Sequence, residues 1–333
     1  MRPRLTPAIA DVRRAVRGGL EAFGGTLPGA SPLALVALSG GADSLALAAA
    51  AAFECPRAGW RIGAIIVDHG LQEDSARQAD RAATQARELG LDPVIVDRVS
   101  IAPGDPAGPE AAARNARYEA FDRALESTGA SCLLVAHTLD DQAETVLLGL
   151  ARGSGPASLQ GMATTAGRIV RPLLGIRRET TRQSCLDLGL TPWDDPHNLD
   201  PAYARVRVRR SVLPVLEAEL GPGVAEALAR TAEQLREDAS ALDDMVGEVA
   251  EDLAELEEAG ISLPVAALEA NPAALRHRLI RLVVSAEFGR SLTRQQTLEV
   301  ARLVTDWRGQ GPIDLPGCTA SRVGGRIVFA ARD

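Results

Sequence analysis

The first half of the chain alternates short apolar runs with alanine-rich or amphipathic segments. The apolar runs contain few polar residues, which is typical of strands that are buried on both faces of a parallel sheet. These runs cover residues 33–38, 61–67, 93–99 and 131–137. The segments between and after them predict helices at 44–53, 75–89, 110–127 and 140–150. Strands that alternate with helices in this way predict an α/β fold with a parallel, doubly wound sheet.

The second half of the chain is looser at first and then mostly helical. Residues 153–199 are rich in Gly, Pro and Thr, and they predict a strand at 168–173 and a helix at 178–188. After the turn at 221–223 (GPG), the pattern predicts one long helix from Val224 to Ala259. The remaining predicted elements are helices at 272–287 and 293–306, and a β hairpin at 313–331 that turns at Gly324 and Gly325.

These elements divide the chain into four predicted segments, with a domain boundary near Gly221 where the pattern changes. The segments are an N-terminal helical extension at 1–30, an α/β domain at 31–220, a linker helix at 221–260, and a mainly helical C-terminal domain with a terminal hairpin at 261–333.

Charge is distributed unevenly, although the net charge is −8. Acidic residues crowd the predicted helix at 224–259, whereas 203–210 (YARVRVRR) and 275–282 (LRHRLIRL) are locally basic. The chain contains no lysine, so all 36 basic residues are arginine. This excludes a Schiff-base lysine and a Walker A lysine, and it leaves arginine, helix N-termini or a metal ion to bind phosphates. The acidic helix is either a rigid spacer or a contact in a homodimer, and both interpretations stay open.

Cysteine spacing and hydropathy limit the class of protein further. Cys55, Cys132, Cys185 and Cys318 lie far apart without a C-x-x-C pair, which argues against a zinc or iron–sulfur site and favours buried thiols. The N-terminal segment lacks the apolar core of a signal peptide, and no apolar run is long enough to span a membrane. We therefore expect a cytoplasmic protein without a membrane partner.

Three polar clusters directly follow predicted strands. They are residues 39–44 (SGGADS) after the first strand, 67–71 (VDHGL) after the second and 137–145 (HTLDDQAET) after the fourth. Ligands of open parallel sheets bind beyond the carboxyl ends of the strands. We therefore expect all three clusters at one ligand-binding edge.

The first cluster has the composition of a phosphate-binding loop. Gly40 and Gly41 allow positive φ and a close approach of ligand to backbone, and Ser39 and Ser44 add hydroxyl groups. The N–H groups of the helix that follows point toward an anion. Asp43 is repulsive to a phosphate unless Mg²⁺ lies between them, so a nucleotide with Mg²⁺ is the predicted ligand.

The third cluster places Asp140, Asp141 and Glu144 in the first turns of a helix. Acidic residues there also suit the helix dipole, but three carboxylates beside one pocket attract a cation, either a metal ion or an alkylammonium group. Asp68 and His69 of the second cluster are by themselves more typical of a cap at a strand end than of a ligand site.

The combined motifs resemble the N-type ATP pyrophosphatases of the PP-loop superfamily, in particular the tRNA(Ile)-lysidine synthetase branch. The likeness rests on SGGADS, VDHGL and residues 137–162 (HTLDDQAETVLLGLARGSGPASLQGM), and it extends through 171–179 (RPLLGIRRE) and 194–214 (DDPHNLDPAYARVRVRRSVLP). It implies a Rossmann-like PP-loop catalytic domain at 31–220 and a tRNA-binding domain at 261–333.

The resemblance also implies roles for individual residues. It assigns Asp43 to Mg²⁺, Asp68 and His69 to the neighbourhood of the adenosine, and His137 to the pocket wall or the nucleotide. Asp141 and Glu144 would bind the amino groups of substrate lysine. The residues that would bind ATP phosphates are Ser39, Gly40, Gly41, Ala42, Asp43 and Ser44.

Two pairs of arginines are candidates for phosphate or RNA contacts. Arg114 and Arg117 lie three residues apart on one predicted helix, where solvated side chains are the alternative. The segment 203–210 would place three guanidinium groups on one side if it is extended. By the resemblance, Arg205 and Arg209 match the two arginines of the family pattern Arg-Asn-x-Ile-Arg. The catalytic residues that the resemblance implies are Asp43, Asp141, Glu144 and Arg205. Val206 replaces the asparagine of that pattern.

The resemblance implies an ATP-dependent ligase that modifies the wobble cytidine of the isoleucine tRNA with a CAU anticodon. ATP would adenylate the oxygen on carbon 2, and the amine of L-lysine would then attack that carbon. Arg276 and Arg278 in the basic segment 275–282 are expected to contact the tRNA. The alternatives are a tRNA thiolase of the same superfamily, whose reactive cysteine pairs are missing here, a glutamine-dependent amidotransferase, and a non-catalytic ATP-binding module.

Overall fold

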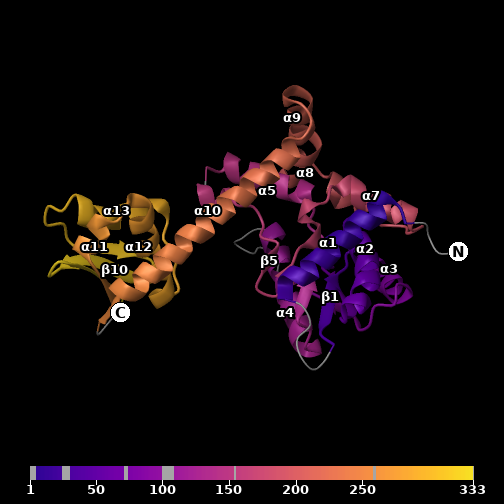
Figure 1. Ribbon diagram of the computed structural model, residues 1–333, viewed down its shortest axis with the longest axis horizontal. Coiled ribbons are helices and arrows are strands. Elements are labelled where there is room, and N and C mark those ends of the chain that lie inside the picture. The colour runs from indigo at the N-terminus through magenta and orange to yellow at the C-terminus, as the bar shows by residue number, and fades with distance from the viewer. Residues whose placement is uncertain are drawn as a thin grey trace. The chain divides into compact units, whose positions relative to one another are not determined.

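The computed structural model describes residues 5–24, 31–70, 74–99, 109–153, 155–257 and 260–332, apart from the side chains of Pro109, Glu110 and His197. The chain forms two compact units, residues 1–235 and 236–333. The division falls inside helix α10 (Val224–Leu253), which the sequence predicts as a linker that begins near Gly221 (Figure 1).

The first unit is built on the predicted parallel sheet. Its strand order is β3-β2-β1-β4-β6-β5, and every neighbouring pair is parallel except β5 and β6. The prediction of a strand at 168–173 is correct only for residues 169–170, and residues 172–175 form a 3-10 turn. The strands are β1 (Leu33–Ala37), β2 (Arg61–Asp68), β3 (Val94–Arg98), β4 (Cys132–Leu134), β5 (Thr165–Ala166) and β6 (Ile169–Val170).

Helices cover both faces of this sheet. The helices of this unit are α1 (Pro7–Gly24), α2 (Ala42–Glu54), α3 (Ser75–Glu88), α4 (Pro109–Thr128), α5 (Leu139–Ala151), α6 (Pro156–Leu159), α7 (Arg178–Asp187), α8 (Ala204–Arg207) and α9 (Leu213–Leu220). The predicted doubly wound α/β fold is confirmed.

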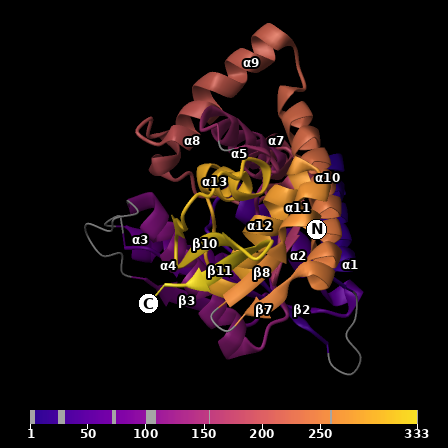
Figure 2. The ribbon, with the colours of Figure 1, turned by 90° about the vertical axis from the view of Figure 1, so that its left-hand side faces the viewer.

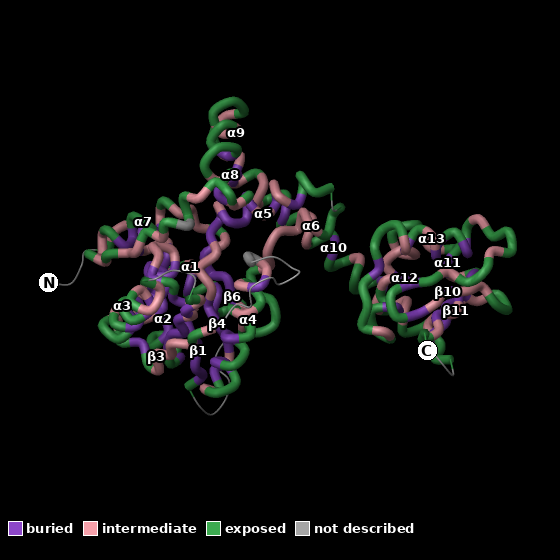
Figure 3. The backbone as a smooth tube through the Cα atoms, turned by 180° about the vertical axis from the view of Figure 1, so that it is seen from behind, coloured by how far each residue is buried: buried purple, intermediate pink, exposed green. Residues whose placement is uncertain are grey.

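Successive residues of the central strands face opposite layers. Ala34 and Val36 pack with α1, α2 and α3, whereas Leu33 and Leu35 pack with Phe121 and its neighbours on α4. Figure 3 shows the buried strands β1 and β4 at the centre of the unit. The apolar face of α1 contributes to the same core, so the described part of the predicted N-terminal extension is integral to this unit.

The order of the strands determines where a ligand fits. Strand β1 lies between β2 and β4, so the chain leaves β1 in one direction across the sheet and later returns to its other side at β4. The loops that follow β1 and β4 therefore flank the switch point, where ligands bind in open α/β sheets. Residues 39–44 and 137–145 both lie there.

The second unit contains a five-stranded antiparallel sheet covered by helices (Figure 2). The predicted hairpin is confirmed: its strands β10 and β11 turn at Gly324 and Gly325, whose φ values are 57° and 80°. Three more strands extend it, in the order β7-β8-β11-β10-β9. The elements are β7 (Glu255–Glu257), β8 (Gly260–Pro264), α11 (Val265–Ala270), α12 (Ala273–Phe288), α13 (Arg294–Thr305), β9 (Ile313–Leu315), β10 (Cys318–Val323) and β11 (Arg326–Ala331).

The prediction that one helix runs to Ala259 is wrong. Helix α10 ends at Leu253, because residues 255–257 leave the helix and pair with β8. Residues 258–259, the end of the predicted helix, lie outside the described residues.

Close packing beside β1 gives a test of this fold. A Cβ on Gly63 of β2 would lie 2.6 Å from the carbonyl oxygen of Pro93 and 2.8 Å from Cδ2 of Leu35. We predict that Gly63→Ala lowers the free energy of unfolding by about 1–3 kcal/mol, the usual cost of overpacking. Urea unfolding followed by circular dichroism measures this change.

The matched control is Gly18→Ala in α1, where a Cβ meets nothing within 4 Å. This variant should be more stable than the wild type by about 0.5–1 kcal/mol, because alanine is the better helix former. A Gly63→Ala protein as stable as the wild type would contradict the close packing described here.

Candidate active site

Residues 39–44, the end of the loop after β1 and the first residues of α2, present the N-terminus of α2 to the edge of the sheet. Gly40 has φ of +81°, and Gly41 precedes the first turn of α2 without a side-chain cap among the described residues. The carbonyl of Gly40 accepts from the N–H of Trp193 at 2.9 Å, and that of Ala42 accepts from the Cys185 thiol at 3.3 Å. An uncapped helix N-terminus attracts an anion.

The two serines of this loop differ in their surroundings. Ser44 is buried; its hydroxyl accepts from the N–H of Ser39 at 3.2 Å and donates to the carbonyl of Gly41 at 3.0 Å. Its contacts therefore serve to shape the loop. Ser39 is exposed, and its hydroxyl lies 3.1 Å from that of Ser44.

Asp43 extends from the first turn of α2 toward α7. One carboxylate oxygen accepts a short hydrogen bond from the hydroxyl of Thr181, and the other lies 3.4 Å from Nε of Arg178. Burial raises the pKa of Asp43 above its usual value, although Thr181 and Arg178 oppose the rise. A carboxylate with a raised pKa is stabilised by an additional nearby cation.

The helix that follows β4 separates its three acidic side chains. Asp141 completes a capping box, in which one of its oxygens accepts from the N–H and the hydroxyl of Thr138, both at 2.8 Å. Its other oxygen faces the same direction as Glu144, which is fully buried. Asp140 points elsewhere and accepts from the N–H of Arg178 at 2.7 Å. The predicted pair of Asp141 and Glu144 therefore lies together, whereas Asp140 lies apart.

Three arginines neutralise this acidic pair. Arg178 contacts Asp141 at 2.7 Å and Glu144 at 3.3 Å, Arg209 contacts Glu144 at 2.7 Å, and Arg205 lies 3.3 Å from Glu144. Burial alone would raise the pKa of Asp141, but Arg178 and Thr138 hold the pKa below its usual value. We call Asp43, Asp141, Glu144, Arg178, Arg205 and Arg209 the charge cluster.

Arg178 is the residue in this cluster that the sequence analysis does not single out. A signal for it was available, because Arg177 and Arg178 stand at the start of a helix, where the helix dipole disfavours positive charge. Two arginines at such a position require acidic partners. Arg177 finds Asp140 at 3.2 Å and Glu226 at 2.9 Å.

The segment 203–210 is not extended. Residues 204–212 form helix α8 followed by a π-helical turn, so Arg205 and Arg209 share one face at a spacing of four. Arg207 points away and donates to the carbonyl of Pro201 at 2.7 Å. Val206, which replaces the family's asparagine, is buried.

The second cluster lies at the end of β2. Asp68 accepts from the N–H of Gly70 at 3.0 Å and lies 3.6 Å from Nε of Arg98, which is the capping arrangement. Arg117 donates to Nε2 of His69 at 3.2 Å. Arg114, also exposed, stacks on the ring of Tyr118 instead.

Two imidazoles near this edge have unsatisfied nitrogens. Nδ1 of His69 and Nδ1 of His137 are both buried, and neither finds a hydrogen-bond partner within the described part of the chain. Burial lowers the pKa of each histidine to about 4, so both rings are neutral at physiological pH. Neutral imidazoles with an unsatisfied nitrogen suit the polar edges of a nucleoside.

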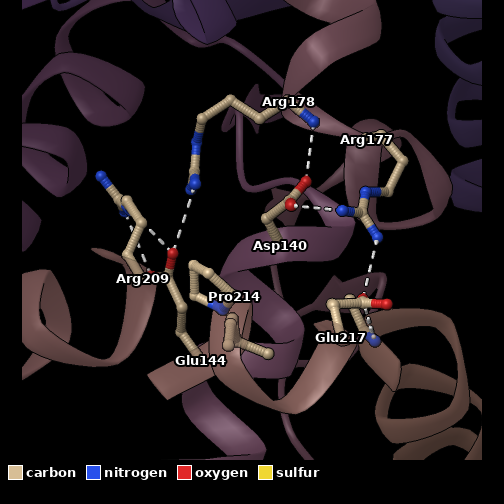
Figure 4. A pocket seen from close by; sticks show the side chains of 9 residues that line it. Asp140, Glu144, Arg177, Arg178, Arg209, Pro214 and Glu217 are labelled. Atoms are coloured by element: carbon tan, nitrogen blue, oxygen red, sulfur yellow. Dashed lines mark hydrogen bonds and ion pairs between the residues drawn. The ribbon is translucent and has the colours of Figure 1, made fainter. Parts of the chain in front are cut away.

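A pocket of about 230 Å³ opens beside the charge cluster (Figure 4). Its wall combines carboxylates, guanidinium groups and three apolar side chains. The lining residues are Asp140, Glu144, Arg177, Arg178, Arg209, Leu213, Pro214, Glu217 and Ala225. Such a pocket can hold a small molecule that carries both charges and an aliphatic chain.

The prediction that the cysteines are buried thiols is confirmed. All four cysteines are buried and unpaired, and burial raises the pKa of Cys55, Cys132 and Cys185 to about 12. Among the described residues, no group of three or more His, Cys, Asp or Glu side chains is arranged to hold a metal ion. Within the same residues, no helix is both long and apolar enough to cross a membrane.

Comparisons with known proteins agree with this architecture. A family model described as the PP-loop domain matches residues 27–216, and a model described as the TilS substrate binding domain matches residues 263–328. The U34-tRNA thiolase NcsA from Methanococcus maripaludis aligns over 69% of this chain and 80% of its own, with a TM-score of 0.56 and 21% identity. That likeness shows a shared fold.

Two relatives match nearly the whole chain. The tRNA(Ile)-lysidine synthase of Leifsonia xyli subsp. xyli is 64% identical over 91% of this chain and 90% of its own length. The tRNA(Ile)-lysidine synthase of Thermobifida fusca is 50% identical over 98% of each. The resemblance identified from the motifs is confirmed, and the chain belongs to the tRNA(Ile)-lysidine synthase family.

Proposed function

We propose that this chain is an ATP-dependent ligase that joins L-lysine to carbon 2 of the wobble cytidine in the isoleucine tRNA with a CAU anticodon. One observation carries the proposal. Asp43, from the loop after β1, and Asp141, from the helix after β4, contact the same guanidinium group of Arg178. A phosphate-binding loop and an acidic amine-binding pair therefore belong to one site, as a two-step ligation requires.

The first step is adenylation. The oxygen on carbon 2 of cytosine attacks the α-phosphate of ATP, and pyrophosphate leaves. The N–H groups at the start of α2, together with Gly40, Gly41 and Ser39, would bind the phosphates, and His69 and His137 would face the nucleoside. Mg²⁺ bound by Asp43 and the triphosphate would spread the charge of the leaving pyrophosphate. The raised pKa of Asp43 fits this role, because the carboxylate gains from a second cation.

The second step is substitution by lysine. The ε-amino group attacks carbon 2, AMP leaves with the former carbonyl oxygen, and the amine loses a proton. The pocket beside Glu144 supports the assignment of lysine, because guanidinium groups, carboxylates and apolar side chains line it together. We propose that Asp141 and Glu144 orient the incoming amine, while Arg205 and Arg114 face the phosphate of the departing AMP.

The tRNA would be bound in part by the second unit. Arg276 and Arg278, the residues expected from the sequence, are engaged: Arg276 donates to the carbonyls of Leu268 and Asn271, and Arg278 pairs with Asp243. We assign the contact instead to His277, Arg281 and Arg294. Arg281 and Arg294 have no ion-pair partner among the described residues. Burial lowers the pKa of His277, and the positive charges of Arg276, Arg281 and Arg294 lower it further.

Asp43 provides the test of the adenylation step. We predict that Asp43→Asn slows tRNA-dependent exchange of pyrophosphate into ATP by at least about 100-fold, because the amide neither binds Mg²⁺ nor balances Arg178. The control is Asp194→Asn, at a carboxylate that is 90% exposed. Exchange at the wild-type rate in Asp43→Asn would contradict the metal assignment.

Glu144 tests the lysine site. Replacing it by Gln leaves three guanidinium groups facing two carboxylates, which repels an ammonium group. We predict a rise of at least about tenfold in the KM for lysine, with ATP–pyrophosphate exchange changed much less. Glu219→Gln, at an exposed position on α9, is the control, and circular dichroism checks folding. An unchanged lysine dependence would remove Glu144 from the amine site.

The tRNA-binding surface is tested by salt dependence. Reversing the charge of Arg281 and Arg294 together should weaken tRNA binding by at least about tenfold. It should also lower the slope of log Kd against log salt by about one for each phosphate that the variant no longer binds. Filter binding at several salt concentrations measures both quantities. Arg302→Glu, at the far end of α13 where Arg302 pairs with Asp306, is the control. Equally weakened binding in both proteins would contradict the assigned surface.

A further inference from the structure

Arg178 stands between the nucleotide loop and the amino-acid pocket. Its Nε lies 3.4 Å from Asp43, its Nη2 lies 2.7 Å from Asp141, and its Nη1 lies 3.3 Å from Glu144. The same side chain lines the pocket. The guanidinium group therefore lies at the position where a substrate cation would meet the acidic pair.

The positive and negative charges of the charge cluster are equal in number. It contains three carboxylates and three guanidinium groups, and six ion pairs connect them. An ammonium group that enters adds an unbalanced positive charge to a site where Glu144 is fully buried. A magnesium nucleotide that binds beside Asp43 adds net negative charge and gives Arg178 a second set of acceptors.

A hydrogen bond holds the backbone of Arg178, and ion pairs hold its side chain. Its N–H donates to Asp140 at 2.7 Å, which fixes the start of α7 (Figure 4). The described ion-pair partners of the side chain are all carboxylates, and phosphate oxygens are acceptors of the same kind. Arg205 and Arg209 remain beside Glu144 if Arg178 leaves.

We infer that Arg178 is a positioning residue that makes lysine binding depend on bound nucleotide. Phosphates beside Asp43 draw the guanidinium toward the nucleotide, and the position it leaves between Asp141 and Glu144 receives the ammonium group of lysine. The inference rests on the proposed function, and it adds an order of binding in which the nucleotide comes first. Because coupling between two ligands is reciprocal, lysine tightens nucleotide binding by the same factor.

Calorimetric titration of lysine, with and without saturating α,β-methylene ATP and Mg²⁺, measures this coupling without turnover. We expect the analogue to lower the Kd of lysine by at least about tenfold in the wild type. We call the ratio of the lysine Kd without the analogue to that with it the coupling factor. In Arg178→Gln the coupling factor should fall below about threefold, because lysine already binds better without nucleotide. Arg182→Gln changes an exposed arginine one turn further along α7, and it should keep the wild-type factor.

The possible results separate the inference from the proposed function. The inference is overturned if the coupling factor of the wild type is near one, or if Arg178→Gln keeps the wild-type coupling factor. In both cases the lysine site stands. Absence of lysine binding in the wild type in both states overturns the lysine pocket and the inference together. If Arg178→Gln does not fold, Arg178→Lys replaces it: one ammonium group cannot reach three carboxylates, so the factor should again fall, and a retained wild-type factor overturns the inference.

Discussion

The ion pairs between Arg178 and the carboxylates of Asp43, Asp141 and Glu144 are the interaction on which the site depends. Asp43 comes from the loop after β1, the other two acids come from the helix after β4, and Arg178 begins α7. These segments meet because β1 and β4 are parallel neighbours, so that their carboxyl ends share one edge. Buried carboxylates are tolerated only when they are paired, and the pairing brings the loop after β1 and the acidic pair of α5 together.

Much of the fold was predictable because its signals are local. The runs at 33–38 and 61–67 are apolar at almost every position, which predicts buried strands, and most of their residues are buried in the structure. The alternation of strands and helices then assigns the polar clusters after them to one edge of the sheet. The helix at 224–259 was predicted too long, because pairing of residues 255–257 with β8 is a long-range interaction that overrides helical propensity. The C-terminal sheet was underestimated for the same reason.

The site was predicted only in part. Alternation of arginine with valine at 205–209 fits an extended strand, yet residues four apart also share a helix face, so the pattern alone could not decide. Arg178 was missed because its partners lie 34 to 135 residues away along the chain. Its partners, and the pairing of Glu144 with arginines rather than solvent, follow from tertiary packing.

The fold alone does not distinguish a lysidine synthase from the tRNA thiolase that shares it, since function depends on the site. Burial raises the pKa of Cys55, Cys132 and Cys185 to about 12, which disfavours a thiolate mechanism. The acidic pair, and the pocket lined by both carboxylates and guanidinium groups, favour an amine. Mass spectrometry of isoleucine tRNA with a CAU anticodon, after incubation with ATP and isotopically labelled lysine, tests the central claim most directly. The account predicts labelled lysine on the wobble cytidine, with AMP and pyrophosphate formed in equal amounts. An unmodified cytidine, or one that carries sulfur, would contradict it.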